Sequence, residues 1–365
     1  MLVGYRGPSH YIQGPGALDS LGELTAGLGA RPALLIDPFL RQSMGEPIER
    51  NLAAKDLAVT FLDFPGEVTY AAIDAMTAQA RADASDCVIA VGGGKAIDTG
   101  KCVAIRLDSP FISVPTAAST DAPASLGAAV YNEQHVRIGS ERLKRHPDIV
   151  IADTAVIARA PARLLAAGIG DALSKKFEAD AAITAGVDSY HGYRAPRLVR
   201  VVADLCYAIL REHGHAAYAD VQVGRSSEAL EAVTEAIILL SPMVFENGGL
   251  SFAHSMQTAL MQGRGTKARM HGEHIAYALL VQLAVENRHD AFIADLMDYL
   301  RPMKLPTSLA ELDCAEPTEM ELNEIARITF ESNWSRNVPF PVGEEQMIAA
   351  MQRIEILSAR HRVVA

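Results

Sequence analysis

Cysteine is scarce in this sequence of 365 residues, and its four copies lie far apart. Cys87, Cys102, Cys206 and Cys314 form no C-x-x-C pair. Disulfide frameworks and redox motifs are recognised by numerous or closely spaced cysteines, which are missing here. We therefore expect reduced thiols, in the core or at the surface of a cytoplasmic protein.

Basic and aromatic residues are also few. Lysine and arginine number 33 against 44 aspartates and glutamates, which gives a formal net charge of −11, and aromatic residues make up 6% of the chain. Nucleic acids and anionic membranes are bound by basic patches. We therefore expect neither as a partner.

No hydrophobic run is long enough to cross a membrane. The longest runs, near 236–245 and 275–285, stop at about ten residues, half of what a bilayer span requires. The first residues, MLVGYRGP, lack the charged and then apolar pattern of a signal peptide. Both features predict a cytoplasmic location.

The length and the order of patterns predict two domains. The chain exceeds one typical core, and its 49% apolar and 21% charged residues are ordinary for a globular protein. In residues 1–150, short apolar runs alternate with helical spacing, which predicts a parallel sheet covered by helices on both faces. The expected strands are Ala33–Ile36, Ala58–Leu62, Cys87–Ala90, Phe111–Val114 and Ile149–Ile151. Gly127–Tyr131 and His135–Gly139 are expected to form a hairpin inserted into this sheet.

Beyond residue 155, alanine-rich segments of helical periodicity replace the strand patterns. The expected helices are Pro161–Ile183, Pro196–His213, Ser226–Leu240, Gly249–Met261, His271–Asn287, Thr318–Asn333 and Glu344–Ala359. We therefore expect an α/β domain over residues 1–158 and an all-α domain over residues 159–365.

A glycine-rich segment follows the central apolar run. Residues 91–101 read VGGGKAIDTGK, directly behind Cys87–Ala90. Consecutive glycines let the backbone approach a ligand closely, and the N-terminus of the following helix adds partial positive charge. This arrangement suits a pyrophosphate, although it is neither the P-loop nor the G-x-G-x-x-G fingerprint. The alternative is a tight strand-to-helix turn that binds nothing. The Gly-Pro-Gly triplet at 14–16 is expected to be a turn.

Three side chains of the second domain are candidate ligands of one metal ion. Asp171 lies inside an expected helix, His254 lies near the start of another, and His271 opens a third. One oxygen and two imidazole nitrogens, with a fourth position open, match the usual ligands of a catalytic zinc. The spacing alone is a weak signal, because the chain has 11 histidines and no H-E-x-x-H motif.

Several longer motifs occur together and in one order. They are YIQG at 11–14, GGGK at 92–95 with Asp98 and Lys101, SVPTAASTDAP at 113–123, ARLLAAGIGDAL at 162–173, FENGGL at 245–250 and HGE at 271–273. Through them the chain resembles, nearly end to end, the glycerol dehydrogenase branch of the iron-containing (group III) alcohol dehydrogenase superfamily. The resemblance implies a Rossmann-like N-terminal domain, a helical C-terminal domain, and a cleft between them that holds NAD and a divalent metal.

The resemblance also implies roles for single residues. The metal ligands would be Asp171, His254 and His271, and Asp121 would contact the substrate; these four are the expected catalytic residues. The residues implied to touch the dinucleotide are Asp37, Gly93, Gly94, Lys95, Asp98, Thr116, Ser119, Ser125, Leu126, Gly127 and Tyr131. We also expect a homo-oligomer.

The chemistry of these residues suits the implied roles. Asp37 ends an expected strand, where a carboxylate can accept from a ribose 2′-hydroxyl and repel a 2′-phosphate, which favours NAD over NADP. It could equally be a turn aspartate before Pro38. Thr116 and Ser119 offer hydroxyls at the carboxyl edge of the sheet, where open α/β sheets bind ligands, or ordinary turn chemistry. Asp121 could orient a substrate hydroxyl or cap its own loop.

Lys175 departs from the family pattern. Iron-dependent members of the superfamily carry a further histidine four residues after the ligand aspartate, and this chain has Lys175 there. A protonated lysine cannot ligate a metal, so the resemblance favours the three-ligand zinc site of glycerol dehydrogenases. If Lys175 faces the cleft, its ammonium would favour an anionic substrate; if residues 174–176 form a solvated face, it carries no such meaning. The segments 136–147 and 251–257 also differ from the usual sequence pattern of the family.

Together these features predict an NAD-dependent, zinc-containing dehydrogenase that oxidises a small polyol, with glycerol to dihydroxyacetone as the type reaction. Zinc would polarise the substrate hydroxyl, and hydride would pass to the nicotinamide. One alternative is a related dehydrogenase acting on an anionic hydroxy acid or polyol phosphate. The other is a lyase similar to dehydroquinate synthase that uses NAD transiently.

Overall fold

The computed structural model describes residues 2–134 and 136–362. The chain divides into two compact units. The sheet unit consists of Gly7–Pro161 and Asp220–Pro242, and the helical unit consists of Met1–Arg6, Ala162–Ala219 and Met243–Ala365. Residues 220–242, which follow the expected boundary by some sixty residues, thus return to the sheet unit.

A six-stranded parallel sheet forms the centre of the sheet unit. In sheet order, its strands are β1 (Tyr11–Gly14), β8 (Ile149–Asp153), β5 (Phe111–Pro115), β4 (Cys87–Gly92), β2 (Pro32–Ile36) and β3 (Thr60–Leu62). The parallel sheet expected from the apolar runs is therefore confirmed. β2, β4, β5 and β8 are buried along their whole length, which explains why they appear as continuous apolar runs in the sequence.

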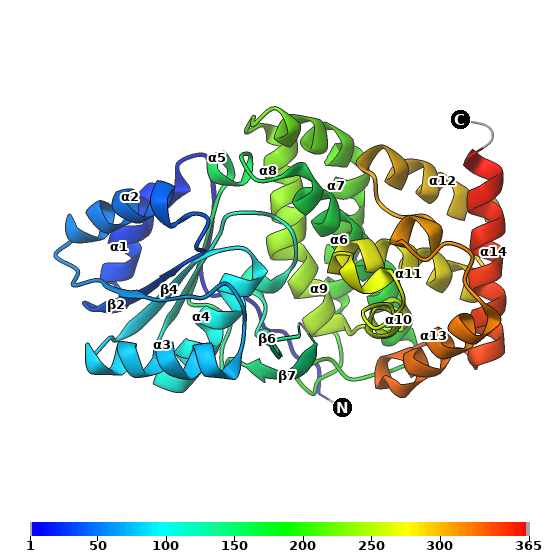
Figure 1. Ribbon diagram of the computed structural model, residues 1–365, viewed down its shortest axis with the longest axis horizontal. Coiled ribbons are helices and arrows are strands. Elements are labelled where there is room, and N and C mark those ends of the chain that lie inside the picture. Colours follow the sequence, from blue (N-terminus) through cyan, green and yellow to red (C-terminus); the bar gives the residue numbers. More distant parts are fainter. Residues whose placement is uncertain (1, 135, 363–365) are drawn as a thin grey trace. The chain divides into compact units, whose positions relative to one another are not determined.

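Helices cover both faces of this sheet (Figure 1). α1 (Leu21–Ala26) and α2 (Arg41–Ala53) lie on one face, and α3 (Tyr70–Ala82) and α4 (Gly94–Leu107) lie on the other. Successive strand residues point to opposite faces of the sheet. Leu34 therefore packs in the core under α1 and α2, and its neighbour Leu35 packs in the core under α3 and α4. Full burial of one such side chain contributes about 1.5–3 kcal/mol.

The expected hairpin exists, but its place in the fold was predicted wrongly. β6 (Gly127–Tyr131) and β7 (Arg137–Arg142) form a separate antiparallel sheet rather than part of the parallel one. The hairpin packs on α4, where Asp98 Oδ2 accepts a hydrogen bond from Ala129 N at 3.0 Å. The second strand begins at Arg137, and residue 135, where it was expected to begin, lies outside the described residues.

Two shorter helices complete the sheet unit. α5 (Thr154–Ile157) follows β8 directly, and α8 (Glu228–Glu235) lies in the returning segment. Gln13 of β1 donates from Nε2 to the Glu231 carbonyl at 2.9 Å. α8 continues through a π-helical turn at Ala236–Leu240 into α9 (Ser241–Gly248).

The helical unit is built around α11 (His271–Val285), which is buried on nearly every side. The other long helices are α6 (Ala162–Thr184), α7 (Arg197–Gln222), α10 (Phe252–Leu260), α12 (Asp290–Leu300), α13 (Glu319–Glu331) and α14 (Glu344–Arg362). α6, α10 and α14 all contact α11. The expected helices are confirmed in type, whereas α9 and α12 were not expected and α7 extends beyond its expected end at His213.

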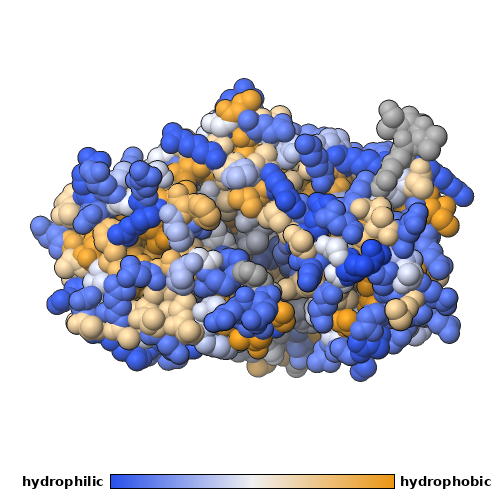
Figure 2. All heavy atoms as spheres, viewed as in Figure 1, coloured by the Kyte–Doolittle hydropathy of each residue, from blue (hydrophilic) through white to orange (hydrophobic). Residues whose placement is uncertain are grey.

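The surface is mainly polar on the face shown in Figure 2. Among the described residues, no helix combines the length and the apolar character that a membrane span requires.

Candidate functional site

Three helices of the helical unit bring the expected metal ligands together. Asp171 comes from the middle of α6, His254 from the first turn of α10, and His271 is the first residue of α11. Asp171 Oδ1 lies 3.4 Å from His254 Nε2 and 3.5 Å from His271 Nε2. The Asp171 side chain is 1% exposed, whereas that of His271 is 37% exposed. The cluster is thus closed on the carboxylate side and accessible at one imidazole.

Two glycines allow α6 and α11 to approach closely at this cluster. A Cβ on Gly272 would lie 1.8 Å from the Ala167 carbonyl oxygen, and a Cβ on Gly170 would lie 2.6 Å from the Gly272 carbonyl oxygen. Both distances are far below van der Waals contact, so only glycine fits at either position. Gly170 precedes Asp171 and Gly272 follows His271, and this helix contact therefore sets the distance between the two ligands.

Glu178 orients His254, a role that the motifs in the sequence did not predict. Its Oε2 lies 2.6 Å from His254 Nδ1, and its Oε1 accepts from the backbone N–H groups of Ser251 and His254 at 3.0 and 3.1 Å. Burial would raise the pKa of Glu178, but His254 and these hydrogen bonds lower it to about 2. The group is therefore an ionised acceptor, and the proton of His254 is on Nδ1. Its spacing of seven residues from Asp171 on one helix was the signal that could have found it.

Lys175 is buried inside the cluster, so of its two alternatives the solvated face does not apply to this residue. Its side chain is 1% exposed, and Nζ lies 2.7 Å from Asp171 Oδ1 and 3.0 Å from His254 Nε2. Nζ also lies 5.4 Å from the centre of the Phe245 ring. Burial would raise the pKa of Asp171, but Lys175 and His271 lower it well below its ordinary value. Lys176, by contrast, pairs with Asp180 and Asp204 and is partly exposed.

Three observations indicate that Asp171, His254 and His271 fit a divalent metal ion. The ligand atoms of Asp171, His254 and His271 all lie within 4.8 Å of one another. Their separations of 3.4 and 3.5 Å resemble those between the ligand atoms of a tetrahedral ion bound at about 2.0–2.2 Å. Asp171 Oδ2 is buried and has no hydrogen-bond partner among the described residues, which is costly unless something binds there.

The nearby His274 has a different role. It is buried, and its Nε2 lies 2.8 Å from the Thr266 carbonyl oxygen. Burial lowers the pKa of His274 to about 4, so the ring is neutral at neutral pH. It tethers the turn before α11 and is not part of the ligand cluster.

The glycine-rich segment lies at the carboxyl end of β4, in the sheet unit. Gly92 has φ +155°, and a Cβ there would lie 2.6 Å from the Ala96 Cβ, so the fold itself requires this glycine. Gly93 is different, because a Cβ there would meet no atom within 4 Å. Gly93 is the N-cap of the 14-residue helix α4 and no side chain caps that end. Free space beside uncapped helical N–H groups suits a phosphate.

Asp37 follows β2 at the same edge of the sheet. Its backbone N–H donates to the Val91 carbonyl at 2.8 Å, which fixes it beside the glycine-rich segment. Its Oδ1 accepts from Phe39 N at 3.0 Å, and the side chain is partly exposed. Both expected roles, turn aspartate and ribose acceptor, are compatible with this geometry, because a carboxylate can accept several hydrogen bonds.

The loop after β5 carries the expected hydroxyls. Thr116 and Ser119 are buried, and Thr116 N donates to the Gly92 carbonyl at 3.1 Å, which joins this loop to the glycine-rich segment. Asp121 is the N-cap residue of a short 3₁₀ helix, Ala122–Ala124. The Thr120 hydroxyl, rather than the Asp121 carboxylate, accepts from Ala122 N at 3.1 Å. Capping is therefore assigned to Thr120.

The remaining expected cofactor residues form a buried polar network around Lys101. Lys101 is fully buried, and its Nζ lies 2.6 Å from the Gly127 carbonyl, 3.2 Å from Ser125 Oγ and 3.4 Å from Asp98 Oδ1. Burial raises the pKa of Asp98 despite these partners. This network fixes the hairpin to α4. Leu126 is fully buried, Tyr131 is partly buried and Lys95 pairs with Glu67 at 2.6 Å.

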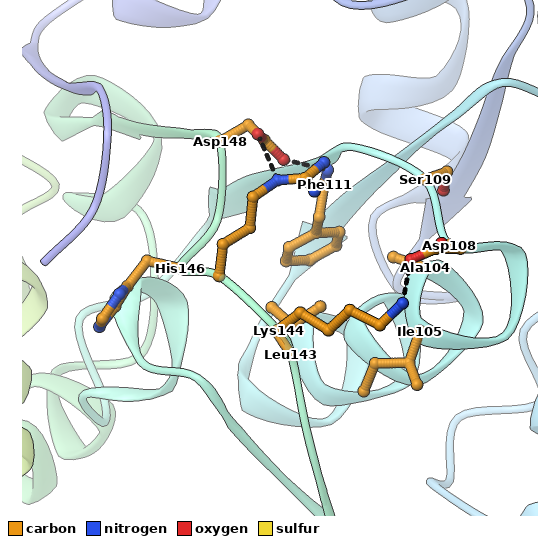
Figure 3. Close-up of a pocket in the computed structure, with 10 residues that line it drawn as sticks. Ala104, Ile105, Asp108, Ser109, Phe111, Leu143, Lys144, His146 and Asp148 are labelled. Carbon is orange, nitrogen blue, oxygen red and sulfur yellow. Dashed lines mark hydrogen bonds and ion pairs between the residues drawn. The ribbon is translucent and has the colours of Figure 1, made fainter. Parts of the chain in front are cut away.

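A small hollow lies at the opposite, amino end of β5 (Figure 3). Its charged side chains are paired: Lys144 Nζ lies 2.7 Å from Asp108, and Asp148 accepts from Arg145 Nε and Phe111 N. These pairs connect the segment 144–148 to the end of α4 and to the start of β5. We assign the hollow a structural role.

The chain is similar to known alcohol dehydrogenases in both sequence and structure. A family profile described as "Iron-containing alcohol dehydrogenase" matches residues 8–154. A glycolaldehyde reductase of Halobacterium salinarum is 35% identical over 97% of this chain and 96% of its own length. A glycerol dehydrogenase of Pseudomonas putida is 35% identical over 94% of each chain. The crystal structure of glycerol dehydrogenase from Schizosaccharomyces pombe is similar with a TM-score of 0.93 and 30% identity, and the match covers 99% of this chain and 92% of that one.

Proposed function

Since the chain belongs to the iron-containing alcohol dehydrogenase family and is an alcohol dehydrogenase enzyme, we propose that it oxidises a secondary hydroxyl of a small polyol with NAD. The type reaction is glycerol to dihydroxyacetone. One observation carries this proposal: an oxygen and two imidazole nitrogens meet at one point of a chain whose relatives of similar length are named glycerol dehydrogenases.

In this proposal the helical unit binds the alcohol. Asp171, His254 and His271 would hold a zinc ion, which supplies Lewis-acid polarisation of the substrate hydroxyl when bound. Glu178 holds His254 in the tautomer that leaves Nε2 available as a ligand. His271 is the exposed member of the cluster, and the substrate would therefore approach from its side.

The sheet unit would bind NAD. The free space at Gly93 and the N-terminus of α4 suit the pyrophosphate, and Asp37 suits the ribose hydroxyl. Thr116 and Ser119 would add hydroxyls at the same edge, and Asp121 would contact the substrate. The buried network of Asp98, Lys101 and Ser125 would hold this edge in place rather than react.

Reduction of a small aldehyde to a primary alcohol is the second candidate, because one relative of 35% identity is named a glycolaldehyde reductase. It needs the same residues, with NADH as the hydride donor. The anionic-substrate alternative is less well supported by the geometry. The ammonium of Lys175 is already paired with Asp171 at 2.7 Å, so a substrate carboxylate would have to compete with a buried partner.

The test is a panel of substrates whose turnover is measured through the absorbance of NADH. Glycerol and other small polyols are offered with NAD, glycolaldehyde and dihydroxyacetone with NADH, and a hydroxy acid and a polyol phosphate complete the panel. We expect the highest kcat/KM with a neutral polyol or its carbonyl product. Preference for the hydroxy acid or the phosphate would refute the neutral-polyol assignment, and a lack of net NADH formation with every alcohol would support the lyase alternative. The homo-oligomer and the cytoplasmic location stay predictions.

A further inference from the structure

The Lys175 ammonium contacts the same two side chains, Asp171 and His254, that would bind a metal ion. Both Lys175 and Asp171 belong to α6, one helical turn apart, and both side chains are 1% exposed. The ammonium lies within hydrogen-bond distance of a ligand atom on each of the two partners, at 2.7 and 3.0 Å. The cluster therefore contains one cation of its own.

The imidazole of His254 can serve only one of the two cations. Its Nδ1 carries a proton and donates to Glu178, so Nε2 is left with a single lone pair in the ring plane. A protonated lysine has only donors, and its contact with Nε2 at 3.0 Å uses that lone pair. A metal ion bonded to Nε2 needs the same lone pair. The hydrogen bond and the metal bond therefore exclude each other.

Asp171 is shared in a different way. Its Oδ1 accepts from Lys175, while its Oδ2 is buried without a hydrogen-bond partner among the described residues. The carboxylate is thus half satisfied by the ammonium. The ring of Phe245, 5.4 Å from Nζ, adds a favourable cation–π contact that holds the ammonium in place.

We propose that Lys175 is a built-in competitor for the metal: its ammonium and a divalent ion are alternative occupants of the Asp171–His254–His271 cluster. This proposal rests on the metal site of the proposed function. Metal uptake then requires Lys175 to release both partners and withdraw. Without metal, the ammonium compensates the charge of Asp171, and the cluster stays folded. The wild-type protein therefore binds zinc more weakly than the same ligand set would without Lys175.

The experiment measures zinc affinity directly, without NAD or alcohol. Chelator-stripped wild type and the Lys175→Met variant are titrated with zinc against a chromophoric zinc chelator at one pH. We expect the variant to bind one equivalent with a Kd at least tenfold lower, because no hydrogen bond to the ligands has to be broken. Lys176→Met is the matched control, since Lys176 follows Lys175 on α6 but pairs with Asp180 of α6 and Asp204 of α7 instead of the ligand cluster. It should match the wild type.

Two further variants keep the result unambiguous. His271→Ala combined with Lys175→Met should lose the tight binding, which shows that the gain arises in this cluster. Lys175→Thr, which is smaller and polar, should also bind zinc more tightly than wild type. It replaces the methionine variant in the titration if that variant fails to fold. Thermal melting adds a second readout: zinc should raise the Tm of the stripped Lys175→Met variant more than that of the stripped wild type.

Equal zinc affinity in the wild type and both Lys175 variants would overturn the proposal, and weaker binding in the variants would make Lys175 a supporting group instead. The proposed function fails separately, when no alcohol on the panel yields NADH. The zinc titration uses neither substrate, so the two failures are distinguishable.

Discussion

Glu178 and His254 form a buried pair in which carboxylate Oε2 and ring Nδ1 lie 2.6 Å apart. A carboxylate behind a ligating histidine fixes the ring and raises its basicity, and loss of such a partner typically costs about ten- to a hundredfold in metal affinity or activity. We expect Glu178→Gln to lower zinc affinity and kcat/KM by that amount. Asp180→Asn, on the same helix, is the control and should leave both unchanged. An unaltered zinc affinity in Glu178→Gln would contradict the assigned role.

The same pair makes stability depend on pH in a defined direction. The pKa of Glu178 is lowered from 4.5 to about 2 in the folded protein, because His254 and the backbone donors outweigh burial. The folded state therefore holds this proton less tightly than the unfolded state does. The stabilisation is present above pH 4.5 and is lost as the pH falls towards 2, a change of roughly 3 kcal/mol. Urea unfolding gives the free energy of unfolding of the stripped wild type and of the stripped Glu178→Gln variant. The difference between the two free energies should become smaller as the pH falls from 4.5 towards 2. A difference that stays constant would mean that Glu178 does not titrate as stated.

Gly272→Ala tests the helix contact that positions the ligands. The new Cβ would lie 1.8 Å from the Ala167 carbonyl, so α6 and α11 must separate. We expect a loss of roughly 1–3 kcal/mol in unfolding free energy, the usual range for overpacking, together with weaker zinc binding. Gly27→Ala is the control, because its Cβ would lie an ordinary 3.5 Å from the Leu24 carbonyl oxygen and its φ of −75° suits alanine. A stable Gly272→Ala protein with normal zinc affinity would show that the contact does not set the site.

Gly93→Ala separates cofactor binding from folding. The position has an ordinary φ of −80° and free space around the added methyl group, so the unfolding free energy should stay nearly constant. If a pyrophosphate lies against this backbone, the methyl group meets it. We expect the Kd for NAD, measured by fluorescence quenching or calorimetry, to rise at least tenfold, about 1.4 kcal/mol. Unchanged NAD affinity would return Gly93 to the role of a simple turn residue.

Asp37→Gly tests the choice of cofactor. The wild type should prefer NAD to NADP by at least tenfold in kcat/KM, about 1.4 kcal/mol, because a carboxylate repels the 2′-phosphate. The variant should narrow that ratio, mainly by improving the KM for NADP. Equal use of both cofactors by the wild type would mean that Asp37 acts only in its turn with Phe39.

The sequence predicted best where local pattern and fold agree. β2, β4 and β5 are buried on both faces, so their apolar runs identified them directly. The hairpin was assigned to the wrong sheet because local alternation does not specify a strand's partner. Its partner is α4, through Asp98 and Ala129, a contact between residues 31 apart.

The candidate site was predictable only as far as local sequence patterns determine it. Helical periodicity placed Lys175 near the face of Asp171, but burial decided its role, and burial depends on the helices that pack around α6. No local pattern distinguishes a lysine that reaches solvent from one that folds back onto its own aspartate. The return of residues 220–242 to the sheet unit was hidden likewise, since it depends on contacts such as Gln13 with Glu231.

That returning segment has a practical consequence for dissecting the molecule. A truncated chain that stops at Pro161 would contain every strand of the parallel sheet yet lack α8 and its bond to β1. It would also lose Ser226, whose hydroxyl lies 3.0 Å from that of Thr154. The sheet unit therefore cannot be excised as one continuous stretch of gene. Expression of this unit alone would require residues 220–242 to be grafted back through a linker, and chimaeras with relatives should exchange both segments together.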